Sequence, residues 1–355
     1  MNIPSNSTPH ILLTGGAGYI GSHTALALLE AGYKVTVIDN LCNSSARALA
    51  SVEQITGKSL HFVQADLLDA QALNACFAHG RFDAVIHFAA LKAVAQSSEI
   101  PLDYYINNVQ GTFNLLRSMQ HHKVGRLVYS SSATVYGTPH FLPYTEAHPT
   151  APINPYGNTK LHIEQLLKDL AASAPGWGFS LLRYFNPVGA HESGDLGEDP
   201  RGIPNNLMPY ITQVAIGKRP HLNIFGGDYD TPDGTCVRDY IHVCDLAQAH
   251  LAATRHLLEQ PIHTASYHDI FNLGSGQGYS VKELVKAFSD ANQIDIPTLI
   301  APRRAGDLPA FWADPAKANA AFGWRTQYSL EDMCRSSWRW QQKHPSGFHG
   351  EDPAA

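Results

Sequence analysis

The sequence predicts an α/β fold: a Rossmann-type, doubly wound parallel sheet followed by a smaller, mixed α/β C-terminal lobe. In the first half, short apolar runs alternate with helical patterns, which indicates βαβ units and a parallel sheet. A glycine-rich turn joins the first apolar run to the first helical pattern. From about residue 186, Gly, Pro and Asp cluster and the elements shorten, which indicates a second, more irregular lobe.

The predicted strands define the domain boundaries. They cover residues 11–14, 34–39, 60–64, 84–88, 126–130, 179–183 and 269–273. The last of these comes late in the chain, so the division is not one clean cut. We expect a nucleotide domain over residues 1–185, rejoined by part of 236–275, and a ligand-binding lobe over 186–355. Helices are expected over 19–31, closed by Gly32, and from Pro155, which suits a first helical turn.

Composition excludes several classes of protein. The 355 residues carry a net charge of −6 and 16% charged residues, which argues against nucleic-acid binding. No apolar run approaches the roughly 20 residues of a membrane span. The five cysteines are spread widely without a C-x-x-C spacing, which favours reduced thiols over a disulfide framework or a metal site. With no signal peptide visible, we expect a cytoplasmic protein.

The turn after the first strand reads Thr-Gly-Gly-Ala-Gly-Tyr-Ile-Gly, with glycines at Gly15, Gly18 and Gly21. A lone glycine triplet is weak evidence, but its place between a strand and a helix favours a dinucleotide-binding loop. Such glycines let backbone N–H groups and the positive end of the helix approach a pyrophosphate. Asp39 ends the second strand, where a carboxylate binds a ribose 2′-hydroxyl and repels a 2′-phosphate. The predicted cofactor is therefore NAD rather than NADP.

Two further strand ends carry candidate cofactor contacts. Asp66 follows the third strand, and a turn-forming role and an adenine contact are equally compatible with its position. Phe88, Ala89 and Ala90 follow the fourth strand and offer small residues where backbone must pass close to a ligand.

A serine and a Tyr-x-x-x-Lys pair predict the chemistry. Tyr156 and Lys160 share one face of a helix, and Ser132 follows the fifth strand. Free tyrosine titrates near pH ~10, too high for an efficient base. A nearby Lys160 ammonium and a positive nicotinamide ring would lower that pKa. Ser132 would then bind the reacting oxygen while Tyr156 exchanges its proton.

With these motifs in this order, the chain resembles the extended short-chain dehydrogenase/reductase superfamily and, within it, the UDP-glucose 4-epimerase family. The similarity runs nearly end to end from about residue 10. It is densest in residues 14–24, 39–44, 85–94, 130–137, 181–190, 202–210, 237–243 and 301–314.

The resemblance implies two sets of binding residues. NAD contacts are implied at Tyr19, Ile20, Asp39, Asn40, Leu41, Cys42, Asn43, Ser44, Asp66, Leu67, Phe88, Ala89, Ala90, Leu91, Lys92, Asn107, Ser132, Tyr156, Lys160 and Phe185. The UDP-sugar would contact Lys92, Ser132, Tyr156, Asn186, Asn206, Leu207, Arg238, Arg304, Asp307 and Phe311. Arginines also suit a diphosphate on physical grounds.

The resemblance further implies an isomerase that interconverts UDP-galactose and UDP-glucose through a 4-keto intermediate, with Tyr156 as proton acceptor, and a homodimer. Ala90 stands where glycine is common in the family. Phe311 stands where tyrosine or a small residue is found, and is expected to exclude N-acetylated sugars. The alternatives are a dehydratase or decarboxylase of the same fold, which would need an acidic residue after the serine, and a non-catalytic NAD-binding sensor.

Overall fold

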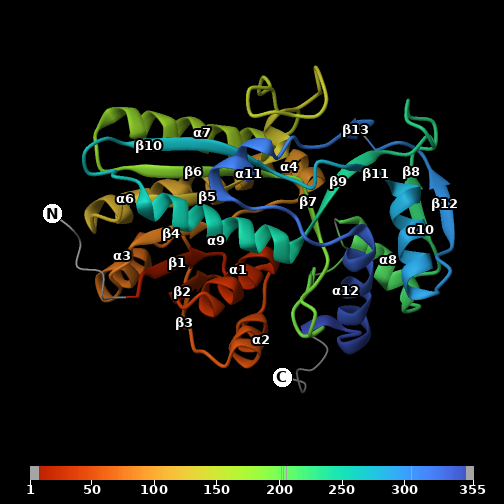
Figure 1. Ribbon diagram of the computed structural model, residues 1–355, viewed down its shortest axis with the longest axis horizontal. Coiled ribbons are helices and arrows are strands. Elements are labelled where there is room, and N and C mark those ends of the chain that lie inside the picture. Colours follow the sequence, from red (N-terminus) through yellow and green to blue (C-terminus); the bar gives the residue numbers. More distant parts are fainter. Residues whose placement is uncertain (1–7, 201, 203, 205, 305, 349–355) are drawn as a thin grey trace.

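The computed structural model describes residues 8–200, 202, 204, 206–304 and 306–348. Seven parallel strands form the main sheet, in the order β10-β6-β5-β4-β1-β2-β3 (Figure 1). Their bounds are β1 His10–Thr14, β2 Lys34–Asp39, β3 His61–Gln64, β4 Ala84–His87, β5 Arg126–Ser132, β6 Gly178–Tyr184 and β10 Tyr267–Leu273.

The predicted parallel sheet is confirmed, with strand ends shifted by one or two residues. β10 begins two residues earlier than predicted, and β5 ends two residues later. β5 continues beyond residue 130 because Ser131 and Ser132 pair in parallel with Arg183 and Tyr184 of β6. Ser132 is thus the last residue of a strand, and its backbone position is fixed by the sheet.

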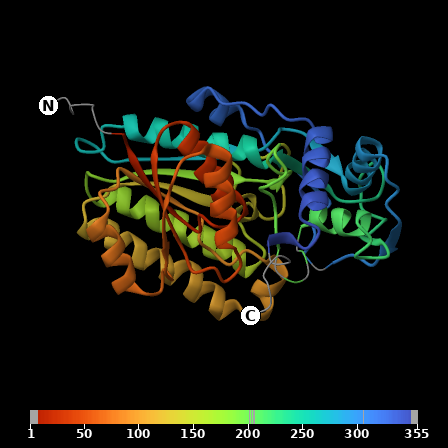
Figure 2. The same ribbon diagram turned by 90° about the horizontal axis from the view of Figure 1, so that it is seen from below.

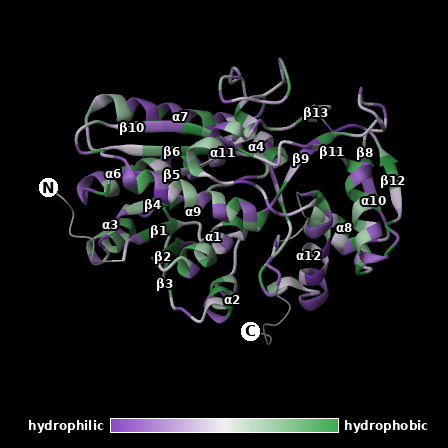
Figure 3. Cartoon of the chain, in the orientation of Figure 1, coloured by the Kyte–Doolittle hydropathy of each residue, from purple (hydrophilic) through white to green (hydrophobic). Residues whose placement is uncertain are grey.

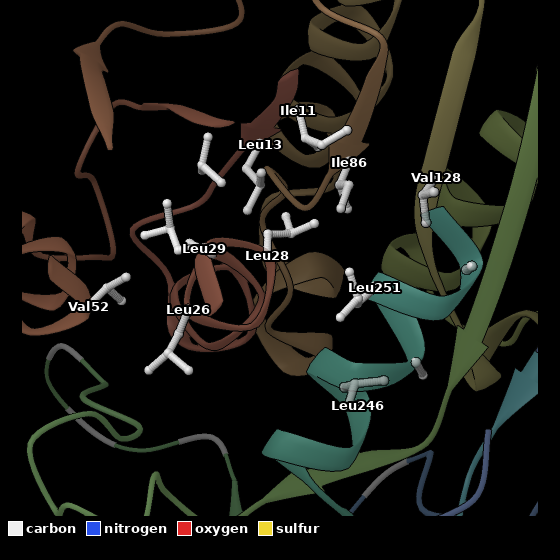
Figure 4. Close-up of a cluster of buried hydrophobic side chains, with 14 of the residues drawn as sticks. Ile11, Leu13, Leu26, Leu28, Leu29, Val52, Ile86, Val128, Leu246 and Leu251 are labelled. Atoms are coloured by element: carbon white, nitrogen blue, oxygen red, sulfur yellow. The ribbon is translucent and has the colours of Figure 1, made fainter. Parts of the chain in front are cut away.

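Helices cover both faces of this sheet. One face carries α1 (Tyr19–Glu30), α2 (Ala46–Thr56) and α9 (Val243–Glu259), and the other carries α3 (Ala70–His79), α6 (Gly111–His121) and α7 (Pro155–Ser173). Strand side chains alternate between the faces: Ile11 and Leu13 join the first core, and Leu12 joins the second. Figure 4 shows the first core, where Leu28 of α1 and Leu251 of α9 lie near Ile86. In Figure 3 hydrophobic residues concentrate along these strands.

Short helices follow β4 and β5 at the edge where the strands end. The chain after β4 forms α4 (Val94–Glu99), α5 (Pro101–Tyr104) and the π-helix η1 (Tyr105–Gln110), and a 3₁₀ turn η2 (Ala133–Val135) follows β5.

A second lobe stands beside the sheet (Figures 1 and 2). It contains α8 (Leu207–Ala215), α10 (Val281–Asn292) and α12 (Leu330–Lys343), packed around a core of their own. Its strands are β7 Asn186–Val188, β8 Leu222–Phe225, β9 Val237–His242, β11 Gly278–Ser280, β12 Thr298–Ala301 and β13 Ala310–Phe311. The chain passes between the lobes, since β9 leads directly into α9 and α11 (Ala316–Phe322) returns to β10. Within the described residues, no helix is long and apolar enough to cross a membrane.

Four buried histidines predict an acid-sensitive fold. Burial lowers the pKa of His87 and His242 to about 3, and that of His23 and His250 to about 4. In the unfolded chain these histidines have the ordinary pKa of about 6.5, so they take up protons below that pH, whereas the folded protein does not. The free energy of unfolding is therefore highest above pH ~6.5 and falls as the pH decreases toward 4. At pH 5.5 each histidine lowers the free energy of unfolding by about 1.4 kcal/mol relative to its value well above pH ~6.5.

Guanidinium unfolding at pH 7.5 and 5.5 measures this loss. Burial raises the pKa of Asp239 and Asp245 to about 6. These carboxyl groups take up protons in the folded protein near pH 5.5, which offsets part of the loss of stability. His250→Phe should reduce the loss, and the matched change at exposed His121 should not. Equal pH dependence in both variants would contradict the assignment.

Candidate active site

The glycine loop lies at the carboxyl end of β1, against the loop that follows β4. Gly15 has φ +71°, and a Cβ there would lie 2.6 Å from the backbone N of Ala89. A Cβ on Gly21 would lie 2.4 Å from the carbonyl oxygen of Gly15. Both positions therefore need glycine, one for its backbone angle and both for close packing. Helix α1 begins after Gly18 with no side chain of the described chain capping it, which leaves its first N–H groups for an anion.

Asp39 and Asp66 lie beside this loop at the ends of β2 and β3. The Asp39 carboxylate accepts hydrogen bonds from the backbone N–H of Ala17 (3.0 Å) and of Leu41 (2.9 Å), and from the Ser44 hydroxyl (2.8 Å). Asp66 accepts from the backbone of Leu68 and from the Asn40 amide, each at 2.8 Å. Asp66 is therefore a turn former in this structure, and its contact with adenine stays a prediction.

The loop after β4 is clamped by a residue that the sequence analysis missed. Buried Asn108 of η1 accepts from the Leu91 N–H (2.8 Å) and donates to the Leu91 carbonyl (3.0 Å) and to Thr159 of α7 (3.1 Å). The neighbouring Asn107, which we expected at the cofactor, donates to Asn108 (2.9 Å). A π-helix often marks a functional site, but its presence here could not be deduced from the sequence.

Helix α7 brings Tyr156 and Lys160 to the end of β5. The helix starts as predicted, because Asn154 accepts the Gly157 N–H at 2.8 Å and Pro155 occupies the first turn. Lys160 is buried, donates to the Ser130 carbonyl (2.7 Å), and its Nζ lies 5.8 Å from the Tyr156 ring centroid. The Ser132 hydroxyl accepts from the backbone N–H (3.2 Å) and the hydroxyl (3.0 Å) of Thr134, and Ser132 lies close enough to Tyr156 to lower the pKa of its phenol. The predicted catalytic residues thus lie together.

The lowering of the tyrosine pKa by Lys160 and a nicotinamide ring together stays a prediction, and burial within the protein acts in the opposite direction. Burial raises the pKa of Tyr156 to about 12, against the opposing effect of Ser132. Burial also lowers the pKa of Lys160 to about 7, against the opposing effect of the Glu164 carboxylate. Burial removes the Tyr156 phenolate and the Lys160 ammonium from water, which disfavours both charged forms. The Lys160 ammonium, which donates to the Ser130 carbonyl, does not offset this loss of hydration for the phenolate.

Predicted substrate residues meet in a second cluster at β9 and β13. Because these strands pair, Phe311 lies opposite Arg238, whose guanidinium stacks 4.4 Å from the Phe311 ring centroid. Asp307 pairs with Arg304 (2.9 Å) and approaches Arg238 (3.9 Å). The other face of this cluster meets Phe185, whose ring lies 5.9 Å from that of Phe311.

A third group joins the two lobes. The amide of Asn206 donates to Glu198 at 2.6 Å, and the Lys92 ammonium lies 3.8 Å from the same carboxylate oxygen. Leu207 follows as the first residue of α8. At β7, the buried side-chain oxygen of Asn186 has no partner among the residues that the structure describes. Buried acceptors are normally paired, so this oxygen fits contact with a ligand.

The chain is similar to known proteins over nearly its whole length. The family model described as GDP-mannose 4,6 dehydratase matches residues 12–337. UDP-glucose 4-epimerase of Dictyostelium discoideum is 54% identical, over 95% of this chain and 97% of its own. That of Bacillus subtilis is also 54% identical, over 95% of this chain and 98% of its own.

The chain belongs to the UDP-glucose 4-epimerase family. The crystal structure of the family member from Bifidobacterium longum, in complex with NAD⁺ and UDP, superimposes with a TM-score of 0.92. It is 50% identical and covers 96% of this chain and 100% of its own.

Two other residues of this epimerase-family chain escaped the sequence analysis. Glu198 lies in the Gly- and Asp-rich segment that we read only as an irregular loop. Phe225, at the end of β8, lies under the Arg304 guanidinium at 4.8 Å. An arginine–aromatic pair between distant segments leaves no local sequence signal.

A sizeable cavity lies away from these groups. It has a volume of about 750 Å³ and lies at the opposite, amino-terminal edge of the sheet, between residues such as His10, Lys34 and Phe82. Volume alone does not identify the site here, because ligands of open parallel sheets bind outside the carboxyl ends of the strands.

Proposed function

We propose that this protein interconverts UDP-galactose and UDP-glucose with a bound NAD. The observation that carries the proposal is the convergence of Tyr156, Lys160 and Ser132 at the carboxyl end of the sheet that bears the glycine loop. Converting UDP-galactose to UDP-glucose with the purified protein, followed by NMR, tests it.

The residues present fit a dinucleotide. Gly15 and Gly21 allow the loop to pack without Cβ atoms, and the start of α1 offers uncapped N–H groups to a pyrophosphate. The Asp39 carboxylate, which accepts three hydrogen bonds, keeps one acceptor site for a ribose hydroxyl. The loop after β4, held by Asn108, is the third wall of this proposed site.

The protein's own contribution to the reaction is control of one proton. When bound, oxidised NAD supplies the acceptor for the electrons removed at C4 of the hexose and a positive ring that favours a nearby phenolate. Tyr156 takes the C4 hydroxyl proton and later returns it, while Ser132 hydrogen-bonds the reacting oxygen. Lys160, fixed on the Ser130 carbonyl, contributes positive charge in its protonated form.

Anchoring the nucleotide instead of the sugar permits the inversion. Arg238 and Arg304, with Asp307 between them, form a group suited to a diphosphate. The flat 4-keto sugar is then free to turn and present its other face, so remote binding energy serves the chemistry.

A dehydratase of the same fold is the nearest rival, since the matching family model carries that name. Such an enzyme needs a further acid–base group beside the serine. Here Ala133 and Thr134 follow Ser132, and neither can supply it. Formation of a 6-deoxy-4-keto product in the same assay would favour the dehydratase, and no product at all would favour a non-catalytic sensor.

We also propose a homodimer formed through α5, η1 and α6. Leu102, Ile106 and Phe113, one from each of these elements, are 70%, 44% and 41% exposed. Contiguous exposed apolar residues mark interaction surfaces. Sedimentation velocity should give twice the chain mass, and Leu102→Asp should shift the protein toward the monomer. A wild-type monomer at micromolar concentration would reject the dimer.

Phe311 predicts restricted sugar specificity. Its ring, held between Arg238 and Phe185, fills space that an N-acetyl group would need. We expect Phe311→Ser to raise kcat/KM for UDP-N-acetylgalactosamine relative to UDP-galactose by about 10- to 100-fold. Initial rates with both sugars measure the ratio, and Phe141→Ser, which changes an exposed phenylalanine, is the control. An unchanged ratio would contradict the steric argument.

A further inference from the structure

The Asn206 side chain does not cap the helix that follows it, α8, within the described residues. Asn206 is the N-cap residue of α8, where asparagine normally accepts a backbone N–H of the first turn. Asn154 does so at the start of α7, at 2.8 Å from the Gly157 nitrogen. The Asn206 side chain forms no such bond to the described part of α8. Its amide is instead donated to Glu198, at 2.6 Å.

Glu198 is itself held in place by the second lobe. The indole of Trp340 in α12 donates to the Glu198 carbonyl at 3.1 Å. The same ring packs on Gly197, where a Cβ would lie 2.4 Å from it. A cavity beside Glu198 has a volume of about 20 Å³, about enough for one water. The side chain, 11% exposed, therefore has little room to turn away from Asn206.

The same carboxylate reaches the other lobe. Lys92, on the loop after β4, places its ammonium 3.8 Å from the oxygen that accepts the Asn206 amide. Burial raises the pKa of Glu198, while Lys92 and Asn206 lower it. Among the residues that the structure describes, this mostly buried carboxylate has only these two polar side-chain partners. Such an arrangement costs free energy, which makes a purely stabilising role a poor explanation for it.

We propose that Glu198 is a positioning residue for UDP-sugar binding, which holds Asn206 and Lys92 in one arrangement before the substrate arrives. The inference rests on the proposed function, because Asn206 and Lys92 are the residues assigned to the UDP-sugar there. Without the acceptor, the Asn206 side chain is free to cap α8 as Asn154 caps α7. The preorganisation is then lost while the helix gains a cap.

The test uses the full-length protein and UDP as the probe, measured by calorimetry. Glu198→Ala should weaken UDP binding and raise KM by about 10-fold, with kcat within about 3-fold of wild type. Its melting temperature should be unchanged or higher, since a cap replaces a buried carboxylate. Glu198→Gln should stay within about 3-fold of wild type, because its amide oxygen can accept the same bond. Glu192→Ala, which removes an exposed carboxylate of the same loop, is the matched control.

A double-mutant cycle sharpens the result. If Glu198 acts through Asn206, adding Glu198→Ala to Asn206→Ala should weaken UDP binding by less than about 3-fold further. UDP binding by Glu198→Ala as tight as wild type, or a glutamine variant as weak as the alanine one, would overturn the proposal. So would a lower melting temperature with equal losses in kcat and affinity. Absence of UDP binding or epimerisation in the wild type would instead reject the proposed function.

Discussion

Replacing Tyr156 with phenylalanine is expected to lower kcat about 1,000-fold, because the variant loses the group that takes up the C4 hydroxyl proton. The ring keeps its place, and the change removes only the hydroxyl, whose pKa partial burial has raised to about 12. NAD content and UDP affinity should therefore stay within about 3-fold of wild type. Steady-state epimerisation rates, with the cofactor content of the purified variant, measure both.

The control is another tyrosine in the same region. Tyr104 is fully buried, is close enough to affect the pKa of Tyr156, and donates its hydroxyl to the Ala93 carbonyl at 2.7 Å. Tyr104→Phe likewise deletes one phenolic hydroxyl but no proton acceptor, so its kcat should change by less than about 10-fold. Near-normal turnover in Tyr156→Phe would show that Tyr156 is not the proton acceptor.

Gly15→Ala is expected to weaken NAD binding by more than about 100-fold. The new Cβ would sit 2.6 Å from the Ala89 nitrogen, and the backbone angle of +71° is strained for alanine. Left-handed strain of about 1–2 kcal/mol and overpacking of about 1–3 kcal/mol act together at this one position. The displaced atoms belong to the two loops that would hold the cofactor.

Gly57→Ala separates these two effects. Gly57 has φ +64°, and a Cβ there would meet nothing within 4 Å. It ends α2, away from the loop, so alanine should cost only about 1 kcal/mol of stability and leave NAD affinity unchanged. Fluorescence titration with NAD and chemical unfolding of both variants test the difference. Equal effects on NAD affinity would show that strain, not close approach, governs the Gly15 position.

The sheet and the α7 start were predictable because local signals agree with the final structure. Apolar runs at β1, β2 and β4 are buried on both faces and carry few polar residues, so their pattern survives in the sequence. Asn154 and Pro155 form a local start signal that needs no tertiary context. The end of β5 was missed because serines favour turns, and only pairing with β6 extends the strand to Ser132.

The grouping of the candidate catalytic residues was predictable, but their electrostatics and the contacts that support them were not. The motifs placed Tyr156, Lys160 and Ser132 together, yet the sign of the phenol pKa shift depends on burial, which sequence does not show. Glu198 and Asn108 were missed because both act through partners on distant segments. In Asn206 the local rule predicts a helix cap, and the tertiary contact with Glu198 overrides it.

The fate of the hydrogen at C4 is the most direct test of the proposed epimerase mechanism. The protein is incubated with UDP-galactose carrying deuterium at C4, in ordinary water, and the products are followed by NMR. The proposed mechanism predicts UDP-glucose that keeps the deuterium at C4, because that atom leaves and returns within one closed site while only the hydroxyl proton passes through Tyr156. Loss of deuterium to water, or a 6-deoxy-4-keto product, would contradict it.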